Sequence, residues 1–307
     1  MKVLFAGTPV VALPSLEALL AAGFDVVGVL TRPDAPLGRK RVLTPSPVAA
    51  RAEELGLPVI RASRVDAEAQ EAIRTLQPEV AAIVAYGALV PPAALQIPPF
   101  GWINLHFSLL PAWRGAAPVQ YAVLHGDEVT GASTFQLEAG LDTGPVFGTV
   151  TEPIRAKDTS EELLSRLARR GAGLLTSTLS FVESGQAVAT PQSGPVSLAP
   201  KLTLADAQVD FHDTALALSR RIRAMTVEPG AWTLLAGQRF KLGPVILRPD
   251  SRGLKPGELA VVNGAALVGT GSHAVQLITV QPAGKKMMSA ADWLRGMATT
   301  QEVMFGE

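Results

Sequence analysis

The sequence predicts an α/β fold with a doubly wound, Rossmann-like sheet, followed by a small OB-like β-barrel. Three observations support this prediction. Apolar strand-like segments alternate with helical segments over residues 1–100, which is typical of β-α-β units. Segment 79–85 is apolar almost throughout, as expected for a strand covered on both sheet faces. Short strand-like segments with Gly turns fill residues 232–280, which is typical of a small barrel.

The first elements form a predicted β-α-β unit. Residues 2–6 read as a buried strand, a helix follows from Pro9 to Ala22 with Thr8 as its cap, and residues 25–30 form the second strand. Neither G-x-G-x-x-G nor G-x-x-x-x-G-K-[ST] follows the first strand, which argues against an NAD enzyme and against a P-loop nucleotide site. We expect further helices at 47–55, 66–76, 117–124 and 158–184, and further strands at 57–60, 79–85, 101–107, 130–138 and 145–151.

The last third of the chain changes in pattern. Residues 187–204 are rich in Pro, Gly and Ser and read as a linker. A helix is expected at 210–224, before strands at 232–235, 239–242, 245–247, 258–262, 266–268 and 274–280. We therefore predict a catalytic domain at 1–187, a linker at 188–205 and a barrel domain at 206–307.

Composition limits the classes of protein that the chain can be. At 307 residues with 48% apolar side chains, it has room for two domains with full cores. Lys and Arg balance Asp and Glu at 27 each, so net charge predicts no polyanionic partner. The absence of cysteine excludes disulfides and Cys-ligated zinc, and His125, His212 and His273 show no metal-ligand spacing. No signal peptide or apolar run of ~20 residues is present, which predicts a cytoplasmic location.

The strand at 101–107 carries a candidate catalytic pair. Residues two apart in a strand project from the same face, so Asn104 and His106 are expected side by side. An Asn amide can donate to a developing oxyanion, and His exchanges protons near neutrality. Pro111 and Gly115 in the following segment indicate a loop at the strand end, where open α/β sheets usually place their chemistry. The pair alone is equally compatible with hydrogen-bonded structural residues.

Residues 32–46 form a long predicted loop with three Pro and four basic side chains. Fifteen residues are more than a simple connection needs. The loop is either a solvated surface segment or a finger that places Arg39, Lys40 and Arg41 against nucleic-acid phosphates.

Two motifs carry a resemblance to a known family. The run from Ser108 to Gln120 reads Ser-Leu-Leu-Pro-Ala-Trp-Arg-Gly-Ala-Ala-Pro-Val-Gln, with Asn104 and His106 ahead of it, and Asp142 lies in Gly-Leu-Asp-Thr-Gly. Together they resemble the signature of the folate-dependent formyltransferases. The chain is most similar to the members that formylate methionyl initiator tRNA. The resemblance continues in 199–202, 229–232 and 286–293, so it covers nearly the whole chain.

The resemblance implies an activity and a set of site residues. A formyl group would pass from 10-formyltetrahydrofolate to the α-amine of methionine on initiator tRNA, in a monomer that needs no metal. Asn104, His106 and Asp142 would be catalytic, and Asp142 would raise the pKa of His106. The basic loop with Arg39 would meet the tRNA. The implied folate-binding residues are Tyr86, Gly87, Ser108, Leu109, Leu110, Pro111 and Gly140.

Three other functions each account for only part of the sequence. A related formyltransferase or a formylfolate hydrolase that acts on a small molecule would need neither the basic loop nor the barrel. A tRNA-binding module without catalysis would not need the Asn, His and Asp. An NAD-dependent oxidoreductase is disfavoured because the glycine fingerprint is missing.

Overall fold

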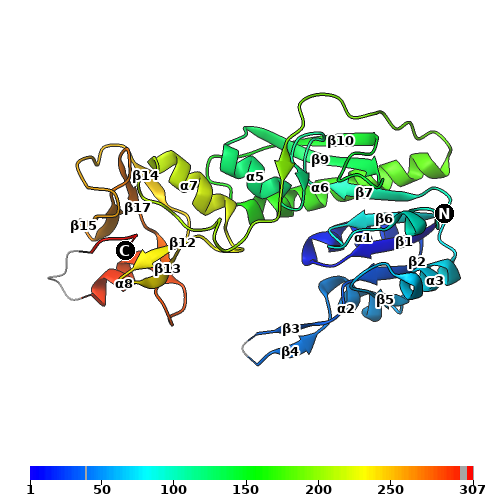
Figure 1. The fold of residues 1–307 in the computed structure, drawn as a ribbon, viewed down its shortest axis with the longest axis horizontal. Helices are drawn as coiled ribbons and strands as arrows, with labels where there is room; N and C mark the ends of the chain where they lie inside the picture. The colour runs from blue at the N-terminus through cyan, green and yellow to red at the C-terminus, as the bar shows by residue number, and fades with distance from the viewer. Residues whose placement is uncertain (39, 298–302, 307) are drawn as a thin grey trace. The chain divides into compact units, whose positions relative to one another are not determined.

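The computed structural model describes residues 1–38, 40–297 and 303–306, which form two compact units (Figure 1). Unit 1 comprises Met1–Pro118, Val129–Pro153 and Leu164–Ala199, and unit 2 comprises Val119–Glu128, Ile154–Leu163 and Pro200–Glu307. Within the described ranges, no helix has both the length and the apolar character that a membrane crossing requires.

Unit 1 is built on a seven-stranded sheet with the order β10-β9-β7-β6-β1-β2-β5. Strands β1, β2, β5, β6 and β7 are parallel, whereas β9 and β10 add an antiparallel edge. The chain moves from β1 outward to β5 and then returns to the other side of β1, which confirms the predicted doubly wound sheet. The strands are β1 (Lys2–Gly7), β2 (Asp25–Thr31), β5 (Val59–Arg61), β6 (Val80–Val84), β7 (Trp102–His106), β9 (Val129–Gln136) and β10 (Val146–Pro153).

Several helices begin at side-chain caps. Ser46 accepts a hydrogen bond from Ala49 N, and Asp66 accepts one from Ala69 N. The predicted cap at Thr8 is wrong, because its hydroxyl donates to Tyr86 O at 2.8 Å and so joins the ends of β1 and β6. The helices of unit 1 are η1 (Val10–Ala12), α1 (Leu13–Ala21), α2 (Pro47–Glu54), α3 (Ala67–Leu76), α4 (Pro92–Leu95) and most of α6 (Ser160–Glu183), whereas α5 (Pro118–His125) lies almost entirely in unit 2.

Helix α6 covers one face of the sheet in unit 1. The Thr134 hydroxyl lies 2.8 Å from that of Thr178, and a Cβ on Gly171 would lie 2.9 Å from the Leu105 side chain. Leu105 and Thr134 therefore face α6. Because side chains alternate along a strand, Asn104 and His106 face away from this helix.

A buried carboxylate ties α6 to the edge strand β10. Glu152 accepts hydrogen bonds from Arg166 Nε at 2.9 Å and Arg170 Nη1 at 2.7 Å. Burial acts to raise the pKa of Glu152, but the two arginines outweigh burial and hold the pKa below its ordinary value. The carboxylate is therefore charged at neutral pH.

The predicted loop at 32–46 is instead mainly a β-hairpin. Strands β3 (Ala35–Leu37) and β4 (Val42–Thr44) pair antiparallel and extend from the body of unit 1 (Figure 1). Arg41 has a φ of 49° and donates its N–H to Gly38 O at 3.1 Å, which closes the turn. Arg39, one of the predicted tRNA-binding residues, lies outside the described residues.

Segments 190–199 and 114–115 also pair within unit 1. β8 (Arg114–Gly115) and β11 (Leu198–Ala199) form a two-stranded parallel sheet. Thr190 and Val146 exchange backbone hydrogen bonds of 2.8 Å, so the same segment also lies along β10.

Unit 2 contains two four-stranded antiparallel sheets, in the orders β12-β13-β18-β19 and β14-β17-β16-β15. The antiparallel strands agree with the prediction, but an OB-like barrel is not confirmed. Phe240, Trp293 and Phe305 pack together in the core, with ring centroids 4.9 to 5.9 Å apart. The elements are α7 (Ala215–Ala224), β12 (Trp232–Leu235), β13 (Gln238–Leu242), β14 (Ile246–Arg248), β15 (Leu259–Val262), β16 (Ala265–Val268), β17 (Ala274–Gln276), β18 (Thr279–Gln281), β19 (Met288–Ser289) and α8 (Ala290–Arg295).

Candidate active site

Strand β7 places Asn104 and His106 on the face of the sheet opposite α6. Asn104 is half-buried, and within the part of the chain that the structure describes its amide has no side-chain hydrogen bond. His106 is the last residue of the strand and is only 6% exposed, with the Phe135 ring packed edge-on against it. The amide of Asn104 is therefore available to a ligand, whereas His106 is held by its surroundings.

The contacts of His106 fix its tautomer. Its Nε2 lies 2.9 Å from the carbonyl oxygen of Trp113. A carbonyl only accepts hydrogen bonds, so Nε2 carries the proton. In the neutral ring Nδ1 is then the unprotonated atom, and it lies 3.7 Å from Oδ2 of Asp142. Both of these atoms are hydrogen-bond acceptors, so a shared proton or a bridging water must lie between them before they can be joined by hydrogen bonds.

Asp142 reaches His106 from the loop between β9 and β10. Its Oδ2 also accepts a hydrogen bond from Gly115 N at 2.7 Å, and the residue is 9% exposed. Its φ of 49° is in the left-handed region, which is costly for a residue with a Cβ. The structure thus brings together His106 and Asp142, which are far apart in the sequence.

Burial dominates the electrostatics of this pair. Burial lowers the pKa of His106 below its ordinary value, and the Asp142 carboxylate and the Trp113 carbonyl only partly oppose it. We predicted that Asp142 would raise the pKa of His106. The carboxylate acts in that direction, but the net shift is downward because the ring is almost completely removed from water. His106 is therefore neutral near pH 7.

The loop after β7 is held by two serine hydroxyls. Ser133 on β9 accepts from Leu110 N at 3.2 Å and donates to Ser108 O at 2.7 Å. Ser108 donates its own hydroxyl to Ala112 O at 2.5 Å and is fully buried. Of the predicted folate-binding residues in this loop, Leu109 and Leu110 are half-buried and Pro111 is buried. The side chain of Ser108 thus serves the loop itself.

Three other predicted folate-binding residues lie at other loops. Tyr86 is 1% exposed and donates its hydroxyl to Ala62 O at 2.9 Å, so its ring belongs to the core. Gly87 is exposed, has a φ of 86° and has open space where a Cβ would lie. Gly140 is exposed in the loop that carries Asp142.

Sequence reasoning missed several residues that hold this site. Gln192 donates from Nε2 to the carbonyl oxygens of Asp142 and Gly144, both at 2.8 Å. Arg114 donates to Gln192 Oε1 from Nε at 3.1 Å and from Nη2 at 2.6 Å. Ser197 accepts from Trp113 N at 2.8 Å. Gln192 and Ser197 lie in the predicted linker, where no periodic pattern marks a residue that packs against a site.

Comparisons with known proteins agree with this geometry. Residues 1–179 match the family described as formyl transferase, and residues 201–298 match formyl transferase, C-terminal domain. A methionyl-tRNA formyltransferase from Renibacterium salmoninarum is 73% identical over 307 residues, which is 100% of each chain. The chain belongs to the formyl transferase family.

Solved structures of lower sequence identity show a similar fold. Methionyl-tRNA formyltransferase from Clostridium thermocellum superposes with a TM-score of 0.59 at 15% identity, covering 81% of this chain and 94% of that one. HypX from Aquifex aeolicus, in complex with tetrahydrofolic acid, superposes with a TM-score of 0.65 at 18% identity. That match covers 100% of this chain and 50% of HypX, so the formyl transferase fold makes up about half of the longer protein.

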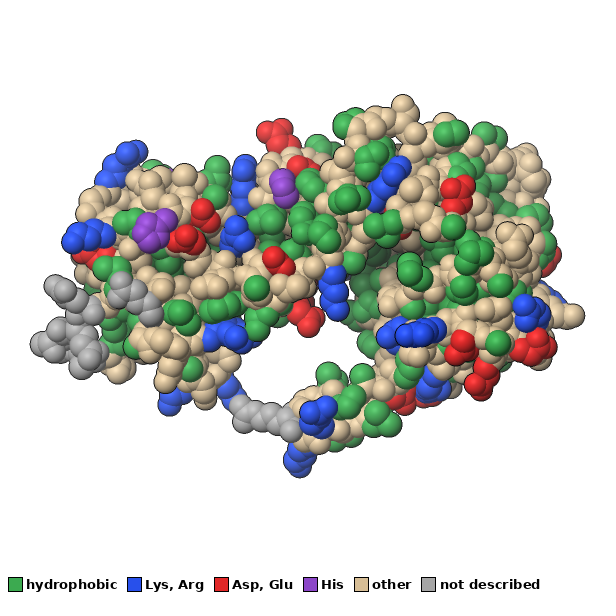
Figure 2. All heavy atoms as spheres, in the orientation of Figure 1, with side chains coloured by type: hydrophobic (Ala, Val, Ile, Leu, Met, Phe, Trp, Pro, Cys, Tyr) green, Lys and Arg blue, Asp and Glu red, His purple; other side chains and the backbone are tan. Residues whose placement is uncertain are grey.

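The β3–β4 hairpin of this family member presents a mixed basic and apolar surface (Figure 2). Lys40 and Arg41 are exposed, and no ion pair with another described residue holds either one. Leu37, Val42 and Leu43 are 67%, 59% and 66% exposed. So many exposed apolar side chains on one short hairpin indicate a binding surface.

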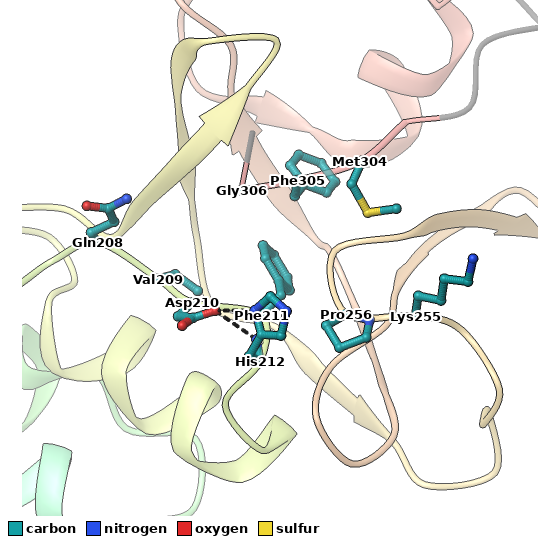
Figure 3. A pocket seen from close by; sticks show the side chains of 10 residues that line it. All are labelled: Gln208, Val209, Asp210, Phe211, His212, Lys255, Pro256, Met304, Phe305 and Gly306. Carbon is teal, nitrogen blue, oxygen red and sulfur yellow. Dashed lines mark hydrogen bonds and ion pairs between the residues drawn. The ribbon is translucent and has the colours of Figure 1, made fainter.

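Unit 2 contains a cavity of about 750 Å³ beside the C-terminal segment (Figure 3). One wall of the cavity contains Asp210, whose Oδ1 accepts hydrogen bonds from His212 N and Nδ1, both at 2.9 Å. Met304 and Phe305 form another wall. The polar groups of this wall are thus already paired with each other. Among the described residues there is no cluster of three or more His, Asp or Glu that could hold a metal ion. The expectation that no metal is needed stays a prediction.

Proposed function

We propose that this chain is a methionyl-tRNA formyltransferase, which transfers the formyl group of 10-formyltetrahydrofolate to the α-amine of methionine on initiator tRNA for translation initiation. The full-length identity of 73% to a methionyl-tRNA formyltransferase carries this proposal. A match limited to unit 1 would leave the formyl acceptor open. The match extends through the C-terminal domain of the family, which supports the same acceptor for this chain.

The side chains around His106 suit the chemistry of formyl transfer. The amine nitrogen attacks the formyl carbon, the carbon–N10 bond of the folate breaks, and the amine loses a proton while N10 gains one. Asn104, whose amide has no hydrogen-bond partner among the described residues, donates to the oxygen that becomes negative; losing one such donor typically costs about 10²–10³ in rate. Neutral His106 and the Asp142 carboxylate accept the proton and return it to N10, directly or through water.

The proposed folate site lies where the strand order reverses, at the ends of β1 and β6. Val10, just after β1, is 67% exposed, and Leu89, after β6, is 86% exposed. Exposed apolar side chains at this position suit the flat pterin ring of folate. Gly87 contributes backbone that a ring can approach closely, and Tyr86 contributes main-chain atoms rather than its buried ring. The loop at 108–111 and Gly140 complete the proposed site.

The proposed tRNA contact is the β3–β4 hairpin. Exposed Lys40 and Arg41, together with Arg39, which precedes them in the sequence, would supply positive charge for phosphate oxygens. The exposed Leu37, Val42 and Leu43 suit the sugars and base faces beside those phosphates. Phosphate contacts position a nucleic acid, so the hairpin orients the acceptor end rather than reading its sequence.

A formyl-transfer assay tests the proposed function. The enzyme receives 10-formyltetrahydrofolate with methionyl initiator tRNA, free methionine or no acceptor. We expect a formylated aminoacyl-tRNA and no product from free methionine. Transfer to a small amine with tRNA ignored, or release of formate alone, would instead identify a small-molecule formyltransferase or a formylfolate hydrolase. The monomeric state and the cytoplasmic location remain predictions, which light scattering and cell fractionation test.

A further inference from the structure

Gln192 lies on segment 190–199, which is anchored at both ends within unit 1. Thr190 pairs with Val146 on β10, and β11 at the other end pairs with β8. Between these anchors, Ser197 accepts from Trp113 N, the residue whose carbonyl holds His106. The segment therefore contacts the loop that carries Asp142 and the loop whose Trp113 carbonyl bonds to His106.

The side chain of Gln192 uses all of its hydrogen-bonding groups. Its two N–H donors go to Asp142 O and Gly144 O at 2.8 Å, and its carbonyl oxygen accepts twice from Arg114. In the opposite amide orientation, the oxygen of Gln192 would face two carbonyl oxygens and its N–H groups would face the N–H groups of a guanidinium. Neither contact is a hydrogen bond, so the surroundings determine the orientation of this amide. Arg114 thus orients Gln192, and Gln192 holds the two carbonyls.

The bond to the Asp142 carbonyl bears directly on backbone strain. Asp tolerates the left-handed region better than most residues with a Cβ, but its φ of 49° still costs energy that contacts with its surroundings offset. Gly115 N holds the carboxylate and Gln192 holds the carbonyl of the same residue. Without Gln192, the backbone of Asp142 is free to relax, and the 3.7 Å separation of Oδ2 from His106 Nδ1 would no longer be maintained.

We propose that Gln192 is a positioning residue for formyl transfer, which holds Asp142 against His106 by clamping the carbonyls of Asp142 and Gly144. This inference rests on the proposed catalytic role of Asp142. Gln192 does not touch the reacting atoms. It acts through Asp142, so its effect should fall on turnover and not on the binding of either substrate.

The test compares Gln192→Glu and Gln192→Ala with the matched control Gln186→Glu. Glu at position 192 keeps an acceptor for Arg114 but cannot donate to the two carbonyls, whereas Gln186 is exposed and its side chain makes no hydrogen bond among the described residues. We expect kcat to fall on the order of 10–100-fold in both Gln192 variants, because displacing a catalytic group by ~1 Å typically costs up to about 10²-fold. The KM values for tRNA and folate should change less than about threefold, and the control should match the parent enzyme.

A double-mutant cycle separates positioning from general structural support. If Gln192 acts through Asp142, Gln192→Ala should cost less than about threefold more in kcat once Asp142→Asn is present. An undiminished loss in that background, or parent-like turnover of Gln192→Glu, would overturn the proposal. If Gln192→Ala does not fold, the cycle is run with Gln192→Met, which keeps the length of the side chain. Full activity of Asp142→Asn alone would contradict the proposed function itself, so the two failures are distinguishable.

Discussion

Gly144 gives the sharpest steric prediction for the loop that carries Asp142. A Cβ at this position would lie 1.8 Å from the backbone oxygen of Gln136, whereas real Cβ atoms essentially never approach closer than 3.0 Å. The Gly144→Ala variant must therefore move one backbone segment by about 1.2 Å. The β9 end is held in the sheet, so the loop moves, and with it the carbonyls that Gln192 holds.

The expected loss follows from that displacement. A shift of about 1 Å in a catalytic group typically costs up to 10²-fold, so we expect kcat to fall about 100-fold in Gly144→Ala. Steady-state formyl transfer to methionyl initiator tRNA measures it, and circular dichroism checks the fold.

A second glycine provides the control. Gly173→Ala lies in α6, where a Cβ meets nothing within 4 Å, and should leave kcat unchanged while stabilising the protein by about 0.5–1 kcal/mol. Turnover of Gly144→Ala within threefold of the parent would refute the argument that the position of this loop limits catalysis.

Four further predictions concern ionisable side chains. His106→Ala should abolish most turnover with the fold intact. Burial lowers the pKa of His106 in the folded protein, so as pH falls below 6.5 the unfolded chain takes up a proton on this residue more readily than the folded chain does. The free energy of unfolding therefore decreases on acidification. His106→Gln should lessen that decrease, as measured by thermal unfolding at several pH values. Glu152→Gln should cost about 1–3 kcal/mol at pH 7, less than a fully buried pair, because one of its two arginine partners is half-exposed. In the parent protein, the stabilisation that Glu152 contributes is fully present above the ordinary carboxylate pKa of 4.5 and is lost as pH falls through the lowered pKa of the folded state. Urea unfolding at several pH values measures this loss. Replacing Lys40 and Arg41 by Ala should reduce the salt slope of tRNA binding by about 2 and leave the folate KM unchanged; equal loss of both would mean that the hairpin is structural.

The sequence was informative wherever a local pattern has a direct physical cause. Alternation along 101–107 predicted that Asn104 and His106 share a face. The Thr-x-x-Glu pattern at 159–162 likewise has a direct cause, because Thr159 and Glu162 bond reciprocally at 2.9 and 3.2 Å at the start of α6. The resemblance supplied Asp142, because its separation from His106 in the sequence carries no pattern.

The sequence was uninformative where the hydrogen-bond partner of a polar side chain lies far away in the sequence. Thr8 precedes a helix and has the chemistry of a cap, but its hydroxyl instead bonds to the backbone after β6 and after β2. The polar, Pro-rich composition of 187–204 suggested a solvated connection. Gln192 within it instead completes a half-buried network of hydrogen bonds, and only the three-dimensional path of the chain reveals this.

The hydrogen bonds of His106 determine which side chain transfers protons and which stabilises the oxyanion. With Nε2–H donated to the Trp113 carbonyl and Nδ1 unprotonated, the neutral ring has no N–H left for the formyl oxygen. Protonating Nδ1 would supply one, but burial lowers the pKa of the ring, and the new N–H would face Asp142. His106 is thereby committed to proton transfer with Asp142. Stabilisation of the oxyanion then falls to Asn104, whose amide has no partner among the described residues.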